Sequence, residues 1–294
     1  MLGIVLPIGL LIVKGSLSTT INSYEKLKSY SYPLLPVIYD HSLIKSENGL
    51  FKRNKKSSKV SEDVVFFHNV ESPIAESYRK IVNQLLYSNP DNVINSVLTT
   101  SSGQGEGKTT FTVNLAAAFA ELDKKVLVID CDFRRPALHK KFSLTNTTGI
   151  KEILFDGHKL SRGIKETEID GLHILTSGSK PVSPAKLLAS KKFSEMIKVI
   201  KPNYDIILFD TPPQSLVSDV SSLISYAEKL IVVARFGSTD GSALKHTIEE
   251  LEKNGGDNIS LALTCYKPSK SYDSIDTKGM HKYMYEKYYE YEKQ

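Results

Sequence analysis

A glycine-rich stretch at residues 100–110 (TSSGQGEGKTT) has residue types and spacing suited to holding phosphate groups. Glycines in a turn let successive backbone N–H groups point at one anion, and a helix that starts there adds its positive dipole end. Lys108 can then reach the outer phosphates of a nucleoside triphosphate, and the Thr109 hydroxyl can bind Mg²⁺. The residues expected to line this phosphate loop are Ser102, Gly103, Gln104, Gly105, Glu106, Gly107, Lys108, Thr109 and Thr110.

Carboxylates follow two of the apolar runs in this chain. Residues 126–130 (VLVID) lead into Cys131 and Asp132, and residues 206–210 (IILFD) end at Asp210. An acid at the tip of a buried strand is costly unless it meets a cation or a hydrogen-bond donor. Beside a phosphate loop the natural cation is Mg²⁺, held directly or through water. One such aspartate could simply cap a helix, but two of them after a phosphate loop favour a magnesium site.

These residues must be positioned by an α/β fold in which strands and helices alternate. Strand candidates lie at residues 93–99, 125–130, 172–176, 205–210, 229–235 and 259–266, and helical patterns lie at 73–88, 109–122, 184–200, 219–227 and 240–254. Short, nearly all-apolar strands between helices predict a parallel β-sheet with helices on both faces. Ligands then bind at the carboxyl ends of the strands, where the phosphate loop and both aspartate motifs lie.

The N-terminal part of the 294-residue chain combines an apolar run with basic residues. The twelve residues 2–13 (LGIVLPIGLLIV) are apolar, but as a helix they span only about 18 Å of a hydrocarbon core of roughly 30 Å. Nine Lys or Arg residues and three acids follow in residues 14–60. A buried strand or helix is one interpretation. The basic residues favour a partial transmembrane segment at 1–17 followed by a basic juxtamembrane linker at 18–70.

Charge and cysteine content narrow the classes of partner. The net charge of +5 is concentrated beside the apolar run, which favours anionic lipid over nucleic acid, so no nucleic-acid partner is expected. Cys131 and Cys265 are the only two cysteines. They give neither a disulfide framework nor metal-ligand spacing, which favours a reducing compartment.

Taken together, these motifs resemble those of the bacterial tyrosine kinases of capsule and exopolysaccharide synthesis, which are built on a P-loop ATPase fold. The matching segments are residues 101–109 for Walker A, 130–136 (DCDFRRP) for the second aspartate motif, 176–188 (TSGSKPVSPAKLL) for an intermediate motif and 210–213 (DTPP) for Walker B. The resemblance covers residues 70–294 well and 1–40 more loosely, as the end of a membrane-anchored activator segment. It implies a kinase domain at residues 71–270, on the cytoplasmic face of the bacterial inner membrane.

The resemblance also implies roles for individual residues, with ATP and Mg²⁺ as cofactors. Lys108 would hold the outer phosphates, and Asp130 would act as base or orienting group for the incoming tyrosine hydroxyl. A phenol has an ordinary pKa near 10, so it needs such help at neutral pH. Arg134 and Arg135 would complement substrate or phosphate charge. The implied catalytic residues are Lys108, Asp130, Asp132 and Asp210, and the implied magnesium ligands are Thr109, Asp132 and Asp210.

A cluster of tyrosines marks the C-terminus. Six of the fifteen tyrosines lie in the last 23 residues, interleaved with Lys and Glu. They do not keep to one helical face, which favours an acceptor cluster over an amphipathic helix, and a tail of this kind at residues 271–294 is typical of the family. Phosphate adds roughly −1.5 to −2 charge per site and could release a tail docked in a neighbour's active site. The expected phosphoacceptors are Tyr283, Tyr285, Tyr288, Tyr289 and Tyr291.

The resemblance implies a kinase that phosphorylates its own tail and regulates capsular or exopolysaccharide polymerisation or export. The expected partners are a membrane-anchored activator or polysaccharide co-polymerase segment, partly in the same chain, further copies in a homo-oligomer, and a cognate tyrosine phosphatase. The sequence differs from the family's motifs at two places that bear on these expectations. Val82 replaces the second arginine of the family's subunit-contact motif, and residues 263–266 lack the asparagine that the family often has near the adenine.

Two alternative functions stay open at this stage. A partition or septum-positioning ATPase shares the fold and the aspartate motifs, but it would carry a lysine at the position of Gly103 and would lack the tyrosine tail. The other alternative is an ATP-gated scaffold of a polysaccharide export machine. The intact set of Lys108 and the three aspartates favours a kinase over such a scaffold.

Overall fold

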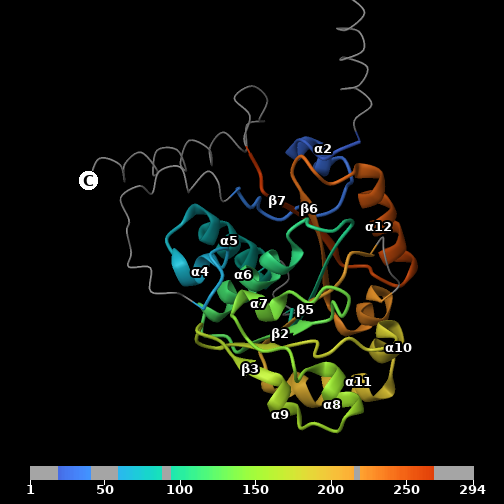
Figure 1. The fold of residues 1–294 in the computed structure, drawn as a ribbon. Coiled ribbons are helices and arrows are strands. Elements are labelled where there is room, and N and C mark those ends of the chain that lie inside the picture. Colours follow the sequence, from blue (N-terminus) through green and yellow to red (C-terminus); the bar gives the residue numbers. More distant parts are fainter. Residues whose placement is uncertain (1–18, 41–58, 88–93, 215–218, 268–294) are drawn as a thin grey trace, which may run out of the picture.

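The fold is built around one mostly parallel β-sheet, shown in Figure 1. The computed structural model describes residues 19–40, 59–87, 94–214 and 219–267. Seven strands lie in the order β3-β4-β2-β5-β1-β6-β7. They are β1 (Ser96–Ser101), β2 (Val126–Asp130), β3 (Ile164–Glu166), β4 (Leu172–Leu175), β5 (Ile206–Asp210), β6 (Lys229–Arg235) and β7 (Ile259–Thr264). The predicted parallel sheet is confirmed, with one correction: the edge strand β3, which the sequence did not reveal, pairs antiparallel with β4.

Helices cover both faces of this sheet, as Figure 1 shows for α4, α5 and α6 on one side and α10, α11 and α12 on the other. The α-helices are α2 (Tyr24–Lys28), α4 (Val65–His68), α5 (Pro73–Tyr87), α6 (Lys108–Ala120), α7 (Leu138–Lys141), α8 (Ile150–Phe155), α9 (Leu160–Gly163), α10 (Pro184–Leu188), α11 (Lys191–Ile200) and α12 (Gly241–Lys253). Every residue of β1, β2, β5 and β7 is buried. Cover on both faces is why β2 and β5 are nearly all apolar up to their final aspartates.

Two predicted helices differ from the structure. The pattern at 184–200 forms two helices: the first ends at Leu188, and Ser190 is the N-cap of the second, where its hydroxyl accepts a hydrogen bond from the Phe193 N–H at 3.2 Å. A serine at that position competes with the helical backbone for hydrogen bonds and favours a new start. The stretch predicted as a helix at 219–227 is a 3₁₀-helix, η3 (Val220–Tyr226).

Much of the stretch expected to be a linker is part of the domain. Residues 33–40 run alongside β7 in parallel, with the Leu35 N–H bonded to Leu261 O and the Ile38 N–H bonded to Leu263 O, both at 2.9 Å. Apolar side chains of residues 19–40 and 59–66, among them Leu27 and Val64, join the core. The domain therefore begins earlier than the predicted residue 71. An extended apolar segment covers an otherwise open sheet edge, which removes unpaired backbone groups and exposed apolar surface.

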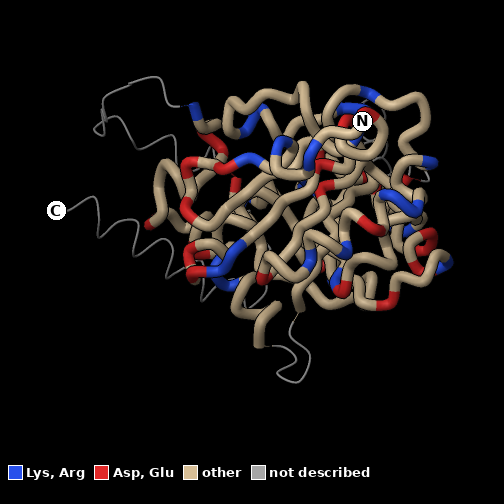
Figure 2. The backbone as a smooth tube through the Cα atoms, turned by 90° about the horizontal axis from the view of Figure 1, so that it is seen from below, with Lys and Arg blue, Asp and Glu red and all other residues tan. Residues whose placement is uncertain are grey.

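Other predictions about the chain ends concern residues that the structure does not describe. Within the described residues, no helix is long and apolar enough to cross a membrane. The partial transmembrane segment predicted at 1–17 and the tyrosine cluster at 283–291 both lie outside the described residues. Figure 2 shows basic and acidic positions mixed along the described chain.

Candidate nucleotide and phosphoryl-transfer site

The phosphate loop lies between β1 and α6, as predicted. Gly105 has φ 76° and Gly107 has φ 91°, and both values fall in the left-handed region that glycine reaches without a steric cost. Gly107 is the N-cap of α6. The first N–H groups of the helix and its positive dipole end therefore face the loop, which is the arrangement that binds phosphate.

The sheet brings the predicted carboxylates to the loop. β2 and β5 are neighbours with Asp130 opposite Asp210, so both acids stand at the carboxyl edge of the sheet. The Thr109 hydroxyl donates to Asp210 Oδ2 at 2.7 Å, and Lys108 Nζ lies 3.5 Å from Asp132 Oδ2. The four predicted catalytic residues and Thr109 thus form one cluster at the start of α6.

Hydrogen bonds distinguish the role of Asp130 from that of Asp132. Both oxygens of Asp130, which is fully buried, accept backbone N–H groups, from Asp132 at 3.1 Å and from Leu138 at 3.3 Å. Asp132 Oδ1 accepts the N–H groups of Arg134 and Arg135 at 3.2 and 2.9 Å, which leaves its Oδ2 toward Lys108. Asp130 therefore shapes the loop after β2. Neither of the two roles toward the tyrosine hydroxyl that the resemblance implies is needed to explain these bonds.

Burial makes the charged forms of two of these acids costly. It raises the pKa of Asp130 well above its usual value, and the nearby Asp210 and Asp132 raise it further. Burial also raises the pKa of Asp210 to about 6, although the charge of Lys108 and the hydrogen bond from Thr109 lower it in part. A cation bound at this edge would relieve both penalties.

The donor set fits a magnesium ion that is shared with a nucleotide. Asp210 Oδ1 is buried and is one of the described side-chain oxygens that have no hydrogen-bond partner, and the Thr109 hydroxyl is bonded to the other oxygen of the same carboxylate. Within the described residues, no group of three His, Cys, Asp or Glu side chains is arranged to hold a metal. Mg²⁺ suits such a site, because it usually takes one or two protein ligands and completes its shell with phosphates and water.

Glu106 proves to be a brace of the phosphate loop. Its buried carboxylate accepts the Gly103 N–H at 2.9 Å and the Thr239 hydroxyl at 2.6 Å. The Thr264 hydroxyl bonds to the Glu106 carbonyl at 3.0 Å, and Arg235 Nη1 bonds to the Gly105 carbonyl at 2.9 Å. Burial raises the pKa of Glu106, and the hydrogen bonds from Thr239 and Gly103 oppose that shift. Sequence reasoning included Glu106 in the loop but could not assign this role, because its partners Thr239 and Thr264 lie between β6 and α12 and at the end of β7.

Replacing Glu106 with Ala should lower the free energy of unfolding by about 1–3 kcal/mol, because the buried hydroxyl of Thr239 and the partly buried N–H of Gly103 lose their acceptor. Glu106→Gln keeps an acceptor oxygen and should cost less. Thermal unfolding of the wild type and both variants measures the difference. An alanine variant as stable as the wild type would show that the brace is unimportant.

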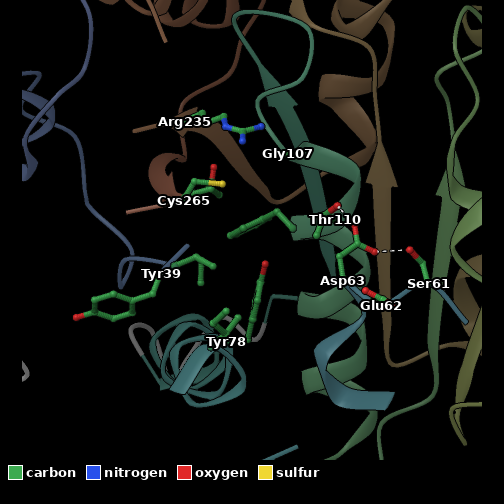
Figure 3. A pocket seen from close by; sticks show the side chains of 13 residues that line it. Tyr39, Ser61, Glu62, Asp63, Tyr78, Gly107, Thr110, Arg235 and Cys265 are labelled. Atoms are coloured by element: carbon green, nitrogen blue, oxygen red, sulfur yellow. Dashed lines mark hydrogen bonds between the residues drawn. The ribbon is translucent and has the colours of Figure 1, made fainter. Parts of the chain in front are cut away.

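A pocket of about 360 Å³ lies beside the loop, shown in Figure 3. It is lined by Ile38, Tyr39, Ser61, Glu62, Asp63, Ile74, Tyr78, Gly107, Thr110, Phe111, Arg235, Thr264 and Cys265. Its apolar and aromatic walls suit a flat ring system, and its polar end is the first turn of α6. Residues 38–39 and 61–63 belong to the stretch predicted as a linker, so sequence reasoning missed them. The extended segment PLLPVIY was the only signal.

Arg134 and Arg135, predicted to complement phosphate charge, follow Asp132 at the same edge. Arg134 is held by an ion pair from its Nε to Asp219 Oδ2 at 3.0 Å, and the Asp219 side chain is almost fully buried. This pair joins the loop after β2 to the start of η3. The predicted phosphoacceptor tyrosines lie outside the described residues, so the structure does not relate them to this site.

Comparison with known proteins gives consistent matches. Residues 97–262 match the family described as AAA domain. The tyrosine-protein kinase YwqD of Bacillus subtilis is 35% identical over 188 residues, which cover 64% of this chain and 79% of that protein. The solved kinase domain of the Escherichia coli tyrosine kinase ETK superposes with a TM-score of 0.75 at 25% identity, covering 86% of this chain and all of that domain. The solved chimerical protein CapA2B2 gives 0.74 at 27% identity, covering 84% of this chain.

Proposed function

The chain belongs to the bacterial tyrosine-protein kinases, and we propose that it transfers the γ-phosphate of ATP to tyrosines in its own C-terminal tail. One observation carries this proposal: Lys108, Thr109 and three aspartates at or just after the ends of β2 and β5 converge on a glycine loop at a helix start. This set matches what phosphoryl transfer requires, since catalysis there is mostly positioning and charge stabilisation.

The residues of the site have different roles in phosphoryl transfer. Lys108 would hold the β- and γ-phosphates, and Thr109 and Asp210 would hold Mg²⁺, which when bound neutralises phosphate charge. The tyrosine oxygen forms a bond to the γ-phosphorus as the bond to the bridging oxygen of ADP breaks. The phenolic proton passes to a carboxylate. Asp132 suits that step better than Asp130, because Asp130 is fully buried and both its oxygens already accept N–H groups.

The pocket beside the phosphate loop is our proposed adenine site. Its aromatic and aliphatic walls, including Tyr39 and Tyr78, suit a purine ring, and Gly107 and Thr110 continue it toward the phosphates. Cys265 lines the pocket within the stretch 263–266, which lacks the asparagine that the family often has, and it adopts a left-handed backbone conformation with φ 53°. Base recognition here therefore rests on packing and backbone groups more than on an amide side chain.

The N-terminal part supports an activator role in the same chain. Residues 33–40 pair with β7 and carry Ile38 and Tyr39 into the proposed adenine site. We propose that this segment and the preceding apolar run act as the membrane-proximal activator, at the cytoplasmic face of the inner membrane. We further propose that the chain assembles into a homo-oligomer and that a tyrosine phosphatase reverses its phosphorylation. Its phosphorylation would control capsular or exopolysaccharide polymerisation or export. These rest on the family membership of the chain.

Autophosphorylation can be tested by changing the five proposed acceptors together to Phe in the full chain. Incubation with ATP and Mg²⁺ followed by intact-mass analysis should show several phosphoryl additions on the wild type. The variant should show little or no gain of mass. Tyr87→Phe is the matched control, because Tyr87 is an exposed tyrosine outside the tail. Full labelling of the five-fold variant would contradict the tail assignment. ADP release with no gain of mass would favour a partition-type ATPase.

A further inference from the structure

Asp63 forms a polar cluster with the first turn of the phosphate-loop helix. Its carboxylate accepts the hydroxyl of Thr110 at 2.8 Å and that of Ser61 at 2.7 Å. It also forms an ion pair with Lys141, at the end of α7. Lys141 Nζ donates to Thr110 Oγ1 at 2.8 Å as well. An acid two residues before α4 thus engages two donors next to the phosphate loop.

The same cluster borders the proposed adenine site. Ser61, Asp63 and Thr110 all line the pocket, together with Gly107 of the loop. Figure 3 shows the Asp63 carboxylate between Ser61 and Thr110, at the end of the pocket where α6 begins. A nucleotide whose base fills this pocket and whose outer phosphates reach Lys108 must place its inner phosphate and ribose near Thr110.

The Asp63 carboxylate and a phosphate group would accept hydrogen bonds from the same donors. A threonine hydroxyl has one proton to donate, so it serves either the carboxylate or a phosphate oxygen. Burial alone would raise the pKa of Asp63, but hydrogen bonds from Lys141 and Ser61 lower it below the usual value, so the group is ionised at neutral pH. Its negative charge also repels phosphate.

We propose that Asp63 is a built-in competitor of the nucleotide: its carboxylate and the inner phosphate of ATP or ADP compete for the Thr110 hydroxyl and the Lys141 ammonium group. This inference rests on the proposed nucleotide site. Lys141 becomes a phosphate-binding residue once Asp63 releases it. Asp63 thereby sets the affinity for nucleotide and couples it to the position of the 59–70 segment.

The backbone around Asp63 is held independently of its carboxylate. Asn114 donates from Nδ2 to the Asp63 carbonyl and accepts the Val65 N–H, both at 2.8 Å. Val64 and Val65 are buried. A change confined to the carboxylate should therefore leave segment 59–70 attached to α6, so that affinity can be compared between folded proteins.

The test is isothermal titration of the full chain with ADP and Mg²⁺. Asp63→Asn and Asp63→Ala should each bind about three- to tenfold more tightly than the wild type, the range expected for removing one half-buried charge contact. Lys141→Met should bind more weakly than the wild type. Asp205→Asn is the matched control, because it removes the same charge just before β5, at the opposite end of that strand from the phosphate loop.

The outcomes separate this inference from the proposed function. If the wild type binds ADP, Lys108→Met does not, and both Asp63 variants bind no more tightly than the wild type, the competitor role is wrong and the nucleotide site stands. If Asp63→Asn and the Asp205→Asn control tighten binding equally, the effect is one of overall charge and the inference also fails. If the wild type binds no ADP, both proposals fail.

Discussion

Replacing Lys108 with Met is expected to reduce tyrosine phosphorylation by about a hundred- to a thousandfold, the cost of removing one preorganised charge-stabilising group from an active site. Lys108 is the first residue of α6, and its ammonium group lies 3.5 Å from Asp132 with only 13% of the side chain exposed. Methionine keeps the length and apolar stem of the side chain, so the helix and its packing should persist. The phosphates would lose the cation that the loop directs toward them.

Intact-mass analysis after incubation with ATP and Mg²⁺ measures this effect, with thermal unfolding as a check of the fold. Lys124→Met is the matched control, because Lys124 is an exposed lysine in the connection between α6 and β2. If the Lys108 variant incorporates phosphate at the wild-type rate, the site described here does not perform the transfer. Loss of phosphorylation in the control as well would point to a general effect of lysine removal.

Replacing Asp210 with Asn should have two opposite effects. Phosphorylation should fall about a hundredfold or more, because a neutral amide is a poor ligand for Mg²⁺. The protein without magnesium should become more stable at pH 7–8 by on the order of 2 kcal/mol, because burial makes the ionised carboxylate costly. Asn has nearly the same shape, and its amide can keep the hydrogen bond with Thr109 and place a polar group where Asp210 Oδ1 lacks a partner.

The pH dependence of this gain follows from the raised pKa. The pKa of Asp210 is about 6 in the fold and 3.8 by its ordinary value. Between these values the folded state binds more protons than the unfolded state, so the stability of the wild type falls with rising pH. The stability advantage of the Asp210→Asn variant over the wild type should be absent below about pH 4, grow up to about pH 6 and stay constant above it.

Thermal unfolding in EDTA at several pH values tests the stability part, with an expected rise of about 4–8 °C at pH 8. Asp156→Asn serves as control, since Asp156 is an exposed acid paired with Lys151 on the surface. A variant that is less stable than the wild type at pH 8 would mean that the ionised carboxylate is stabilised by its surroundings. The proposed cost of keeping this acid for catalysis would then be wrong.

The sequence by itself determined the phosphate loop, the succession of most strands and helices along the chain, and the meeting of the proposed catalytic groups. Thr109 and Asp210 lie 101 residues apart, yet their contact could be predicted. The reason is that parallel strands place all their carboxyl ends at one edge, so each side chain that follows such a strand arrives at the same place. Apolar runs and a glycine loop define those strand ends locally.

Only the tertiary structure decided what surrounds that cluster. The brace by Glu106, the pocket walls from Ile38 and Tyr39, and the contact of Asp63 with Lys141 all involve irregular segments. Asp63 and Lys141 are 78 residues apart, and neither follows a strand of the sheet. No periodic pattern fixes the path of such segments. Their positions depend on which sheet edge and helix face remain uncovered once the regular elements have packed, a property of the whole fold.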